Sequence, residues 1–293
     1  MNTSYLLIPR IQIQNANAMS SAWTIGFPAM TAWMGAVHAL ERKLQNSALW
    51  SSIRLSDMAV SCHACDLQIY RGKGDFLNSI SVTANPLRKK GTEFERPPFI
   101  EEARIHLTAS LLIRIEEMPA GKEEIFCQDV VGCLNRMKIA SGDLIAWDAP
   151  SVLYADGENE ERKIISRLMP GYILVERKDL VRKYTKYGMD SLDAVLSLVS
   201  VCHHCESDDG GQRWNYSRLE PGWLVPIAVG FKGISPTGRS ANQRDPSVFH
   251  RFAESVVTMG EFKMPYRISR ISDLLWHYQY CPEKNLYICT NER

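Results

Sequence analysis

The sequence predicts an α+β fold, and three observations lead to this expectation. A strand pattern at residues 6–14 runs through a polar loop into an amphipathic helix. A second strand pattern, residues 104–115, alternates between apolar and polar side chains, which is typical of a sheet with one buried face. Strand-like sequence returns at residues 223–231, so the sheet is expected to be completed from both ends of the chain. We therefore predict a ferredoxin-like body, similar to the RNA-recognition-motif (RRM) fold, with an inserted helical domain.

Length and composition limit the possible classes of protein. A chain of 293 residues with 45% hydrophobic residues can bury a substantial core, in one elaborated domain or two. No apolar stretch approaches the roughly 20 residues that cross a bilayer, and no basic segment precedes an apolar one at the start. We therefore expect a cytoplasmic protein without membrane contact. The net charge of +1 argues against a general binder of polyanions, although it allows local basic grooves.

The first strand and the loop after it offer groups that bind rather than catalyse. Ile11 and Ile13 give the strand an apolar face, and its other face is polar. Amides and hydroxyls form hydrogen bonds but do not titrate near neutral pH. The candidate binding residues here are Arg10, Gln12, Gln14, Asn15, Asn17, Ser20 and Ser21. The alternative for the loop is a capped turn whose side chains satisfy their own backbone.

A helix is expected after this loop. Pro28 fits the first helical turn, where the missing amide hydrogen costs nothing. The helix should end near Gln45 and pack its apolar face on the sheet. The residues at helical spacing on that face are Met30, Trp33, Met34, Val37 and Leu44.

A long polar connection is predicted between two strands. Strand-like sequence at residues 58–70 ends in the turn 71–74, and proline and glycine residues interrupt the chain from there to Pro98. Arg71 and Lys73 lie between glycines in this turn. They are candidate binding residues, with a solvated hairpin tip as the alternative. Long loops in compact proteins are commonly functional or mobile.

The middle of the chain reads as an inserted helical module. Helical patterns occur at residues 125–139, 160–168 and 176–201. The predicted organisation is therefore a body whose first part is residues 1–118, an inserted helical thumb at residues 119–205, and a second body part at residues 206–293.

A second polar loop, residues 235–246, follows the late strand. Guanidinium groups match phosphate oxygens, and amides can recognise base edges or sugar hydroxyls, so the mixture suits single-stranded RNA. The candidates in and after this loop are Arg239, Asn242, Arg244, His250 and Arg251. Pairing of Arg244 with Asp245 is the alternative. We expect this loop and the early polar loop to line one crease.

The cysteines and the missing motifs bear on cofactors. Two CxxC pairs, residues 62–65 and 202–205, have the spacing of a structural zinc site, yet some 140 residues separate them and Cys65 lies in a strand-like run. We expect reduced thiols and no cofactor. Neither a GxxxxGK[ST] loop nor a GxGxxG after a strand occurs, so nucleotide hydrolysis is not indicated.

Two blocks of sequence carry a family resemblance. They are LLIPRIQIQNANAMSS with GFPAMTAWMGAVHALERKL near the start, and PGWLVPIAVGFKGISP with NQRDPSVFHRFAESVVTMGEF near the end. Together they resemble the second subunits of the Csy complex, the CRISPR surveillance complex of subtype I-F. The resemblance implies a non-enzymatic protein that binds the 5′ handle of the CRISPR RNA (crRNA). It also implies an RRM-like body with a thumb, contacts with the large subunit and the backbone subunit, and access to target DNA through the complex.

Two alternatives from other classes stay open. One is a metal-independent endoribonuclease that cleaves CRISPR repeat RNA on a related fold, with His38, His63 or His106 as acid or base. The other is a zinc-stabilised interaction module. The histidines have no serine or cysteine at a spacing that identifies a catalytic triad, so we expect no enzyme.

Overall fold

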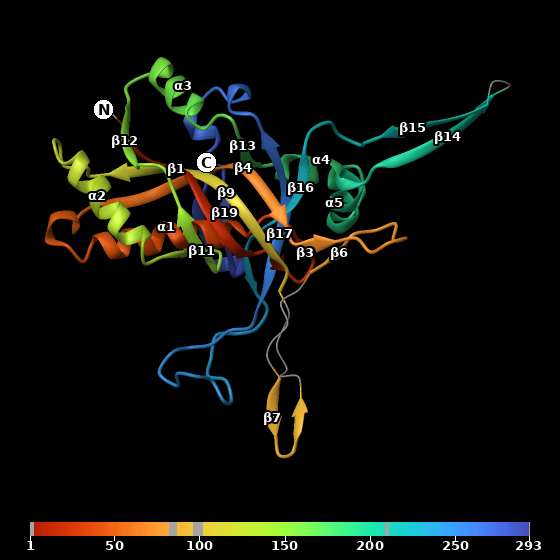
Figure 1. Cartoon of the computed structure of the whole chain (residues 1–293), viewed down its shortest axis with the longest axis horizontal. Helices are drawn as coiled ribbons and strands as arrows, with labels where there is room; N and C mark the ends of the chain where they lie inside the picture. The colour runs from red at the N-terminus through yellow and green to blue at the C-terminus, as the bar shows by residue number, and fades with distance from the viewer. Residues whose placement is uncertain (1–2, 82–86, 96–101, 209–210, 293) are drawn as a thin grey trace.

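The structure is a computed structural model that describes residues 3–81, 87–95, 102–208 and 211–292 (Figure 1). Its centre is one curled sheet in which every pair of neighbouring strands is antiparallel. From edge to edge the strands are β10 (Lys138–Ile139), β11 (Gly142–Ala146), β1 (Thr3–Asn17), β9 (Arg104–Glu116), β4 (Arg54–Leu67), β13 (Tyr172–Glu176), β17 (Ala253–Lys263), β16 (Leu224–Gly233), β19 (Leu286–Thr290) and β18 (His277–Cys281), while β12 (Ser151–Ala155) also pairs with β1. The prediction of an α+β fold is confirmed at this level, and strands from both ends of the chain do complete one sheet.

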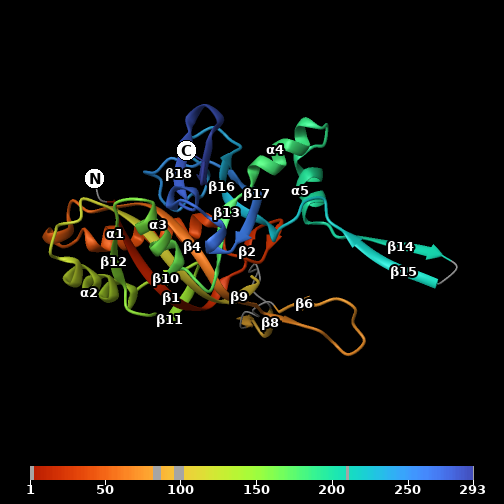
Figure 2. The same ribbon diagram turned by 90° about the horizontal axis from the view of Figure 1, so that it is seen from above.

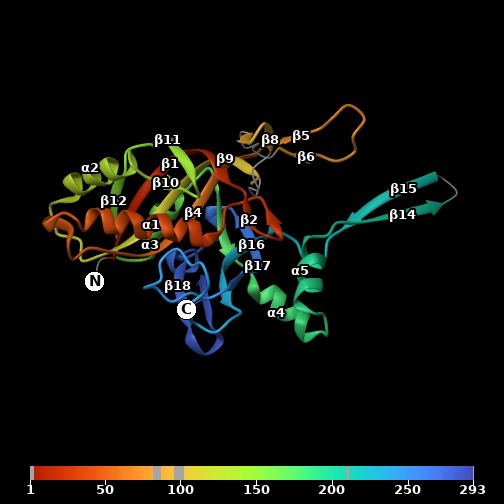
Figure 3. The ribbon, with the colours of Figure 1, turned by 90° about the horizontal axis from the view of Figure 1, so that it is seen from below.

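The helix α1 (Met30–Leu44) lies inside the curl of the sheet. It contacts β4 on one side and β16 and β19 on the other, so the sheet wraps around it as half of a barrel (Figures 2 and 3). The predicted helix is confirmed, because α1 ends at Leu44, with Gln45 as its C-cap, and buries all five apolar residues named above. Pro28 lies just before the N-cap Ala29, so the expectation that it occupies the first helical turn is wrong. Helix α2 (Glu123–Leu134) packs beside α1 on the same face and contributes Phe126 and Val130 to the main core.

The strand β1 is longer than predicted and contains two bulges. It runs on to Asn17, and its register against β9 shifts between Ile8 and Ile11 and again between Ile13 and Ala16. Arg10 and Asn15, inside these shifts, have positive φ angles of 49° and 57°. The extra residues keep the apolar side chains on the core face despite the broken alternation. The predicted loop is short, because residues 19–25 form the hairpin of β2 (Met19–Ser21) and β3 (Thr24–Ile25).

The second face of the sheet is covered over only part of its area. Tyr5, Leu7 and Leu112 point to this face and pack on Ile164 and Ile165 of α3 (Glu158–Ser166) in a separate core. Helix α3 therefore covers the part of the sheet that contains the beginning of β1 and the end of β9. Toward Arg10 and beyond, the same face carries polar side chains that remain accessible.

Residues 119–205, predicted as a helical insertion, contain helices and strands. The helices are α2, α3, α4 (Lys178–Lys186) and α5 (Ser191–Val199), and the strands β10 to β13 belong to the main sheet. The prediction of a single helix at residues 176–201 is wrong, because the chain turns at Gly188, which has a φ angle of 94°. The strands were missed because segments such as Tyr172–Glu176 are too short to display a period.

Three hairpins leave the main sheet. The pair β14 (Cys202–Asp208) and β15 (Gly211–Ser217) and the pair β5 (Ile69–Tyr70) and β6 (Ser79–Ile80) extend from the same side of the molecule in all three views. A third hairpin joins β7 (Arg88–Lys90) and β8 (Glu93–Glu95). The β5–β6 and β7–β8 hairpins belong to the predicted polar connection. Residues 82–86 and 96–98 of that connection lie outside the described residues. Within the described ranges, no helix has the length and hydropathy to cross a membrane.

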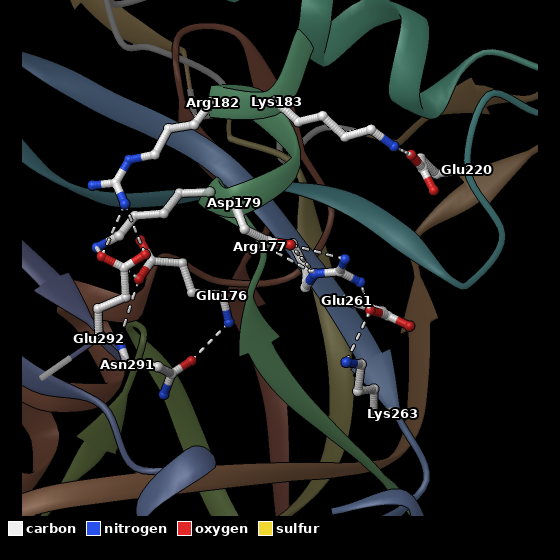
Figure 4. Close-up of polar contacts among 11 residues, drawn as sticks. Glu176, Arg177, Asp179, Arg182, Lys183, Glu220, Glu261, Lys263, Asn291 and Glu292 are labelled. Atoms are coloured by element: carbon white, nitrogen blue, oxygen red, sulfur yellow. Dashed lines mark hydrogen bonds and ion pairs between the residues drawn. The ribbon is translucent and has the colours of Figure 1, made fainter. Parts of the chain in front are cut away.

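A network of ion pairs fixes α4 to the sheet (Figure 4). Arg177 binds Glu261 of β17 and also Asp179, at 2.9 Å from Nε to Oδ1. Glu292, which follows β19, accepts from Lys178 and Arg182, with both nearest distances 3.0 Å. Because these pairs join α4 to β17 and to the segment after β19, helix and sheet are expected to move together.

Candidate nucleic-acid interface

A groove lined by both polar and apolar residues crosses the open part of the sheet, on the face opposite α1 and α2. It consists of two adjoining cavities of about 400 Å³ and 330 Å³, which share Gln12, Ala64 and Thr108. The register of β1 on β9 pairs Gln12 with Thr108 and so brings the two polar faces together. We call this the strand-face groove, and its polar and aromatic lining residues are Arg10, Gln12, Gln14, His63, Asp66, His106, Thr108, Trp147 and Asp148.

A chain of hydrogen bonds fixes one end of the groove. The backbone N–H of Arg10 donates to Ser110 Oγ at 3.0 Å, and Ser110 Oγ lies 2.6 Å from His63 Nε2. His63 Nδ1 binds the carbonyl of Pro170. A neutral imidazole that donates from Nδ1 and accepts at Nε2 satisfies all of these contacts. Burial lowers the pKa of His63, and the charge of Arg10 adds to this effect, which favours the neutral ring.

Asn15 lies beside the opposite end of the groove, where it contacts the lining residue His106. Its backbone N–H donates to His106 Nδ1 at 3.2 Å, and its side-chain oxygen accepts from Gln68 Nε2 at 2.6 Å. The guanidinium of Arg104 donates to the Asn15 carbonyl at 3.3 Å. Asn15 therefore holds the edge of the groove in position, and its side-chain oxygen is already engaged within the chain.

The remaining candidates of the early loop mainly serve their own turn. Asn17 Oδ1 accepts from the backbone N–H of Met19 at 2.8 Å. Ser20 and Ser21 both contact Thr24 Oγ1, at 2.8 and 2.7 Å, and Ser21 is buried. This is the arrangement of a capped turn, which was the alternative reading of this loop. The candidates that line the groove are Arg10, Gln12 and Gln14, and Asn15 lies beside it through its contact with His106.

Arg71 and Lys73 lie in the tip of the β5–β6 hairpin. Arg71 Nε donates to the carbonyl of Asp75 at 2.7 Å, and both cations are exposed. The hairpin begins directly after Gln68, the residue that binds Asn15. It therefore leaves the sheet beside the Asn15 end of the groove.

The late candidates occupy the loop between β16 and β17 (Figure 1). Gly238 and His250 pair across its base, Asn242 has a φ of 60°, and Arg251 donates to Asn285 Oδ1 at 2.6 Å. Arg239 and Arg244 are exposed. Asp245 accepts from the hydroxyl of Ser247 at 2.7 Å, so its carboxylate is engaged away from Arg244.

The early and late loops lie at opposite ends of β16. The β2–β3 hairpin contacts β16, and Phe27, which follows it, packs on Phe262, whose ring also packs on Trp223 at the Leu224 end. The late loop leaves from Gly233, at the other end of this strand of 10 residues. At about 3.3 Å per residue the two ends are roughly 30 Å apart. The expectation that both loops line one crease is not met within this chain.

The two CxxC pairs belong to different sheets. Cys62 and Cys65 lie in β4, where a bulge at residues 62–64 brings them together on one face, and Cys202 and Cys205 lie in the β14–β15 hairpin. The hydrogen bond from Cys62 lowers the pKa of Cys65 to about 6. In the described part of the chain, no group of three or more metal-binding side chains occurs.

Several groove residues were not among the sequence candidates. The alternating face of residues 104–114 already marked His106, Thr108 and Ser110 as polar and partner-facing. The position of His63 and Asp148 at the groove could not be predicted from the local sequence. It depends on the pairing of β4 and on the place of the segment after β11, which are set by contacts far apart in sequence.

Comparison with known proteins identifies relatives over almost the whole chain. A family model described as "CRISPR-associated protein (Cas_Csy2)" matches residues 6–289. A protein described as "CRISPR-associated protein Csy2", from Pseudomonas aeruginosa (strain UCBPP-PA14), is 33% identical over 315 residues. This alignment covers 96% of the present chain and 93% of the relative.

Proposed function

The chain belongs to the Csy2 family of CRISPR-associated proteins, and from this premise we propose that it is a non-catalytic subunit of a type I-F RNA-guided surveillance complex. In this proposal its task is to bind the 5′ handle of the crRNA within a Cascade or Csy assembly, for antiviral defence or RNA-guided DNA targeting. The observation that carries the proposal is the strand-face groove, whose amides, hydroxyl and imidazoles suit unpaired bases and 2′-hydroxyls.

The order of strands and helices supports an RRM-like body. Along the chain, β1, α1, β4, β9, α2 and β11 follow one another, and in the sheet β9 lies between β1 and β4. This is the split βαβ arrangement of ferredoxin-like folds. RRM domains bind RNA on the face of their sheet. In this chain the corresponding face lies opposite α1 and α2, and the part of it that α3 leaves uncovered carries the groove.

We propose two kinds of contact with the handle. The groove residues Gln12, Gln14 and Thr108 recognise bases or sugars, and the exposed cations outside the groove neutralise phosphates. Those cations are Arg71, Lys73, Arg239 and Arg244, with Asn242, His250 and Arg251 beside the last two. Because the late loop leaves β16 at the end remote from the early hairpin, we expect it to meet another stretch of the same RNA or another subunit.

The partners follow from the family and from exposed apolar side chains. We propose that the large subunit and the backbone subunit dock on this chain in the cytoplasm, with no membrane contact. Residues 119–205 act as the thumb, and its outermost part is α4 and α5, where Leu192 and Leu196 are 66% and 52% exposed. Target DNA is then selected by base pairing with the guide, and this chain fixes only the end of the guide.

The proposal that no bond is cleaved is supported by the state of the groove histidines. Both ring nitrogens of His63 are engaged, with Ser110 and Pro170. His106 contacts Asn15 and Gln68. An acid or base for RNA cleavage needs a free ring nitrogen that faces the scissile phosphate.

Coexpression tests this function. We expect the chain to copurify with the large subunit and the handle RNA as one species on a sizing column, and we expect repeat RNA to remain intact in the presence of the protein. Separate elution of chain and large subunit contradicts the assembly role. Metal-independent cleavage that is lost in His63→Gln or His106→Gln establishes the endoribonuclease instead.

A further inference from the structure

Each of the two cavities of the strand-face groove contains one carboxylate. Asp66 lines the larger cavity, beside Gln14 and His106, and Asp148 lines the smaller one, beside Arg10 and Trp147. Register pairs Asp66 with His106, so the carboxylate belongs to the polar face of the sheet. Among the residues that the structure describes, neither carboxylate forms an ion pair or a side-chain hydrogen bond.

The charge of the lining argues against phosphates inside the groove. Arg10 supplies one positive charge, and Asp66 and Asp148 supply two negative charges, so the formal charge of these three side chains is −1. A phosphate placed between these carboxylates meets like charge at short range. The nucleobases, which are uncharged, do not meet this repulsion. The sugar–phosphate chain of a bound strand is therefore expected to lie outside the groove, with its bases directed inward.

We propose that the strand-face groove binds unpaired nucleobases by their edges and prefers bases that carry an exocyclic amino group, with Asp66 and Asp148 as the acceptors. This inference rests on the proposed RNA-binding function and adds to it the class of base. It assigns a selective role to two residues that were not among the sequence candidates.

The preference follows from the hydrogen-bonding edges of the bases. Cytosine and adenine offer amino donors, and guanine offers two adjacent N–H donors to one carboxylate. Uracil has a single ring N–H between two carbonyl oxygens, which repel a carboxylate. We therefore expect guanine, adenine and cytosine to bind more tightly than uracil.

Binding of short homopolymeric RNA tests the proposal. The full-length chain is titrated with labelled oligo(A), oligo(C) and oligo(U), and the same is done with Asp66→Asn and Asp148→Asn. These changes keep the shape of the side chain but replace an acceptor with an amide that can also donate. The control is Asp156→Asn, at an exposed aspartate outside the groove. Thermal midpoints verify that each variant is folded.

The expected result is a preference for oligo(A) and oligo(C) over oligo(U) that falls about tenfold in each groove variant and stays unchanged in the control. Unchanged preferences in both groove variants overturn the assignment of the carboxylates. The double variant Arg10→Ala, Gln12→Ala separates this failure from failure of the proposed function. If it loses RNA binding while the aspartate variants keep the wild-type preference, the groove binds RNA without these acceptors. If it binds all three oligomers as the wild type does, the groove is not the RNA site.

Discussion

His63 Nε2 lies 2.6 Å from Ser110 Oγ, and this contact joins β4 to β9 on the open face of the sheet. His63 alternates with the core residues Val60 and Cys62, so its ring lies on the opposite, open face. Ser110 Oγ in turn accepts a hydrogen bond from the backbone N–H of Arg10, which lies in the first bulge of β1. Three strands are thus fixed relative to one another where the groove begins, and the groove is expected to exist before any ligand binds.

The neutral state of His63 predicts a pH dependence of stability. Burial lowers the pKa of this ring below its ordinary value of 6.5, so below that pH the unfolded chain binds more protons than the folded chain. The contribution of His63 is therefore complete above pH 6.5 and is lost as the pH falls through the folded-state pKa. Urea unfolding at about pH 7.5 and about pH 5.5 should show a larger loss for the wild type than for His63→Gln. Equal losses contradict the assignment.

Gly171 provides the space that His63 occupies. A Cβ at this position meets Ser61 Oγ at 2.5 Å and His63 Nδ1 at 2.7 Å. Ser61 is buried and donates to the carbonyl of Leu168 at 3.0 Å, so it has little freedom to move. We expect Gly171→Ala to lower the free energy of unfolding by about 1–3 kcal/mol. Gly132→Ala on α2 is the control, because its Cβ meets no atom within 4 Å. Equal stability of the two variants contradicts the packing described here.

Arg244 is expected to contact phosphate rather than a neighbouring carboxylate. Its sequence neighbour Asp245 is engaged by Ser247, which leaves the guanidinium exposed for a ligand. Arg244→Ala should weaken handle binding and reduce the slope of log affinity against log salt concentration by about one. An unchanged slope excludes a phosphate contact at this residue. Gln12→Ala provides the comparison, because loss of a neutral groove contact should weaken binding with little change of slope.

Cys65 should be unusually reactive. Its pKa of about 6, set by the hydrogen bond from Cys62, makes it a thiolate at neutral pH, and its side chain is exposed. We expect alkylation by iodoacetamide to follow a titration with a midpoint near pH 6, as measured by mass spectrometry of the Cys65 peptide. In Cys62→Ala the midpoint should move upward. The same profile in both proteins contradicts the pairing of these thiols.

The elements that the sequence predicted well are those with a long, regular pattern. The helix α1 and the strand β9 each display their period over more than ten residues, and both were found with their buried faces. The short strand β13 was missed, since five residues display no period and its neighbours β4 and β17 are distant in the chain. Register and bulges, which decide where side chains converge, depend on such long-range pairing.

The candidate site was predictable in the same uneven way. The polar faces of β1 and β9 could each be read from alternation, and their register joins them into the groove. The bulge at His63 and the position of Asp148 in the smaller cavity could not be predicted from the sequence, because both depend on residues that are distant in the chain. The idea of one crease between the early and late loops was not met, because the ten residues of β16 separate them.

Photo-crosslinking of the handle RNA to the assembled complex tests the central claim most directly. The handle carries 6-thioguanosine at single positions, and crosslinked peptides are identified by mass spectrometry. The account predicts crosslinks to peptides that contain residues 10–15 and 104–110, and their loss in the variant Arg10→Ala, Gln12→Ala. Crosslinks confined to residues 234–252, with none to β1 or β9, would contradict it.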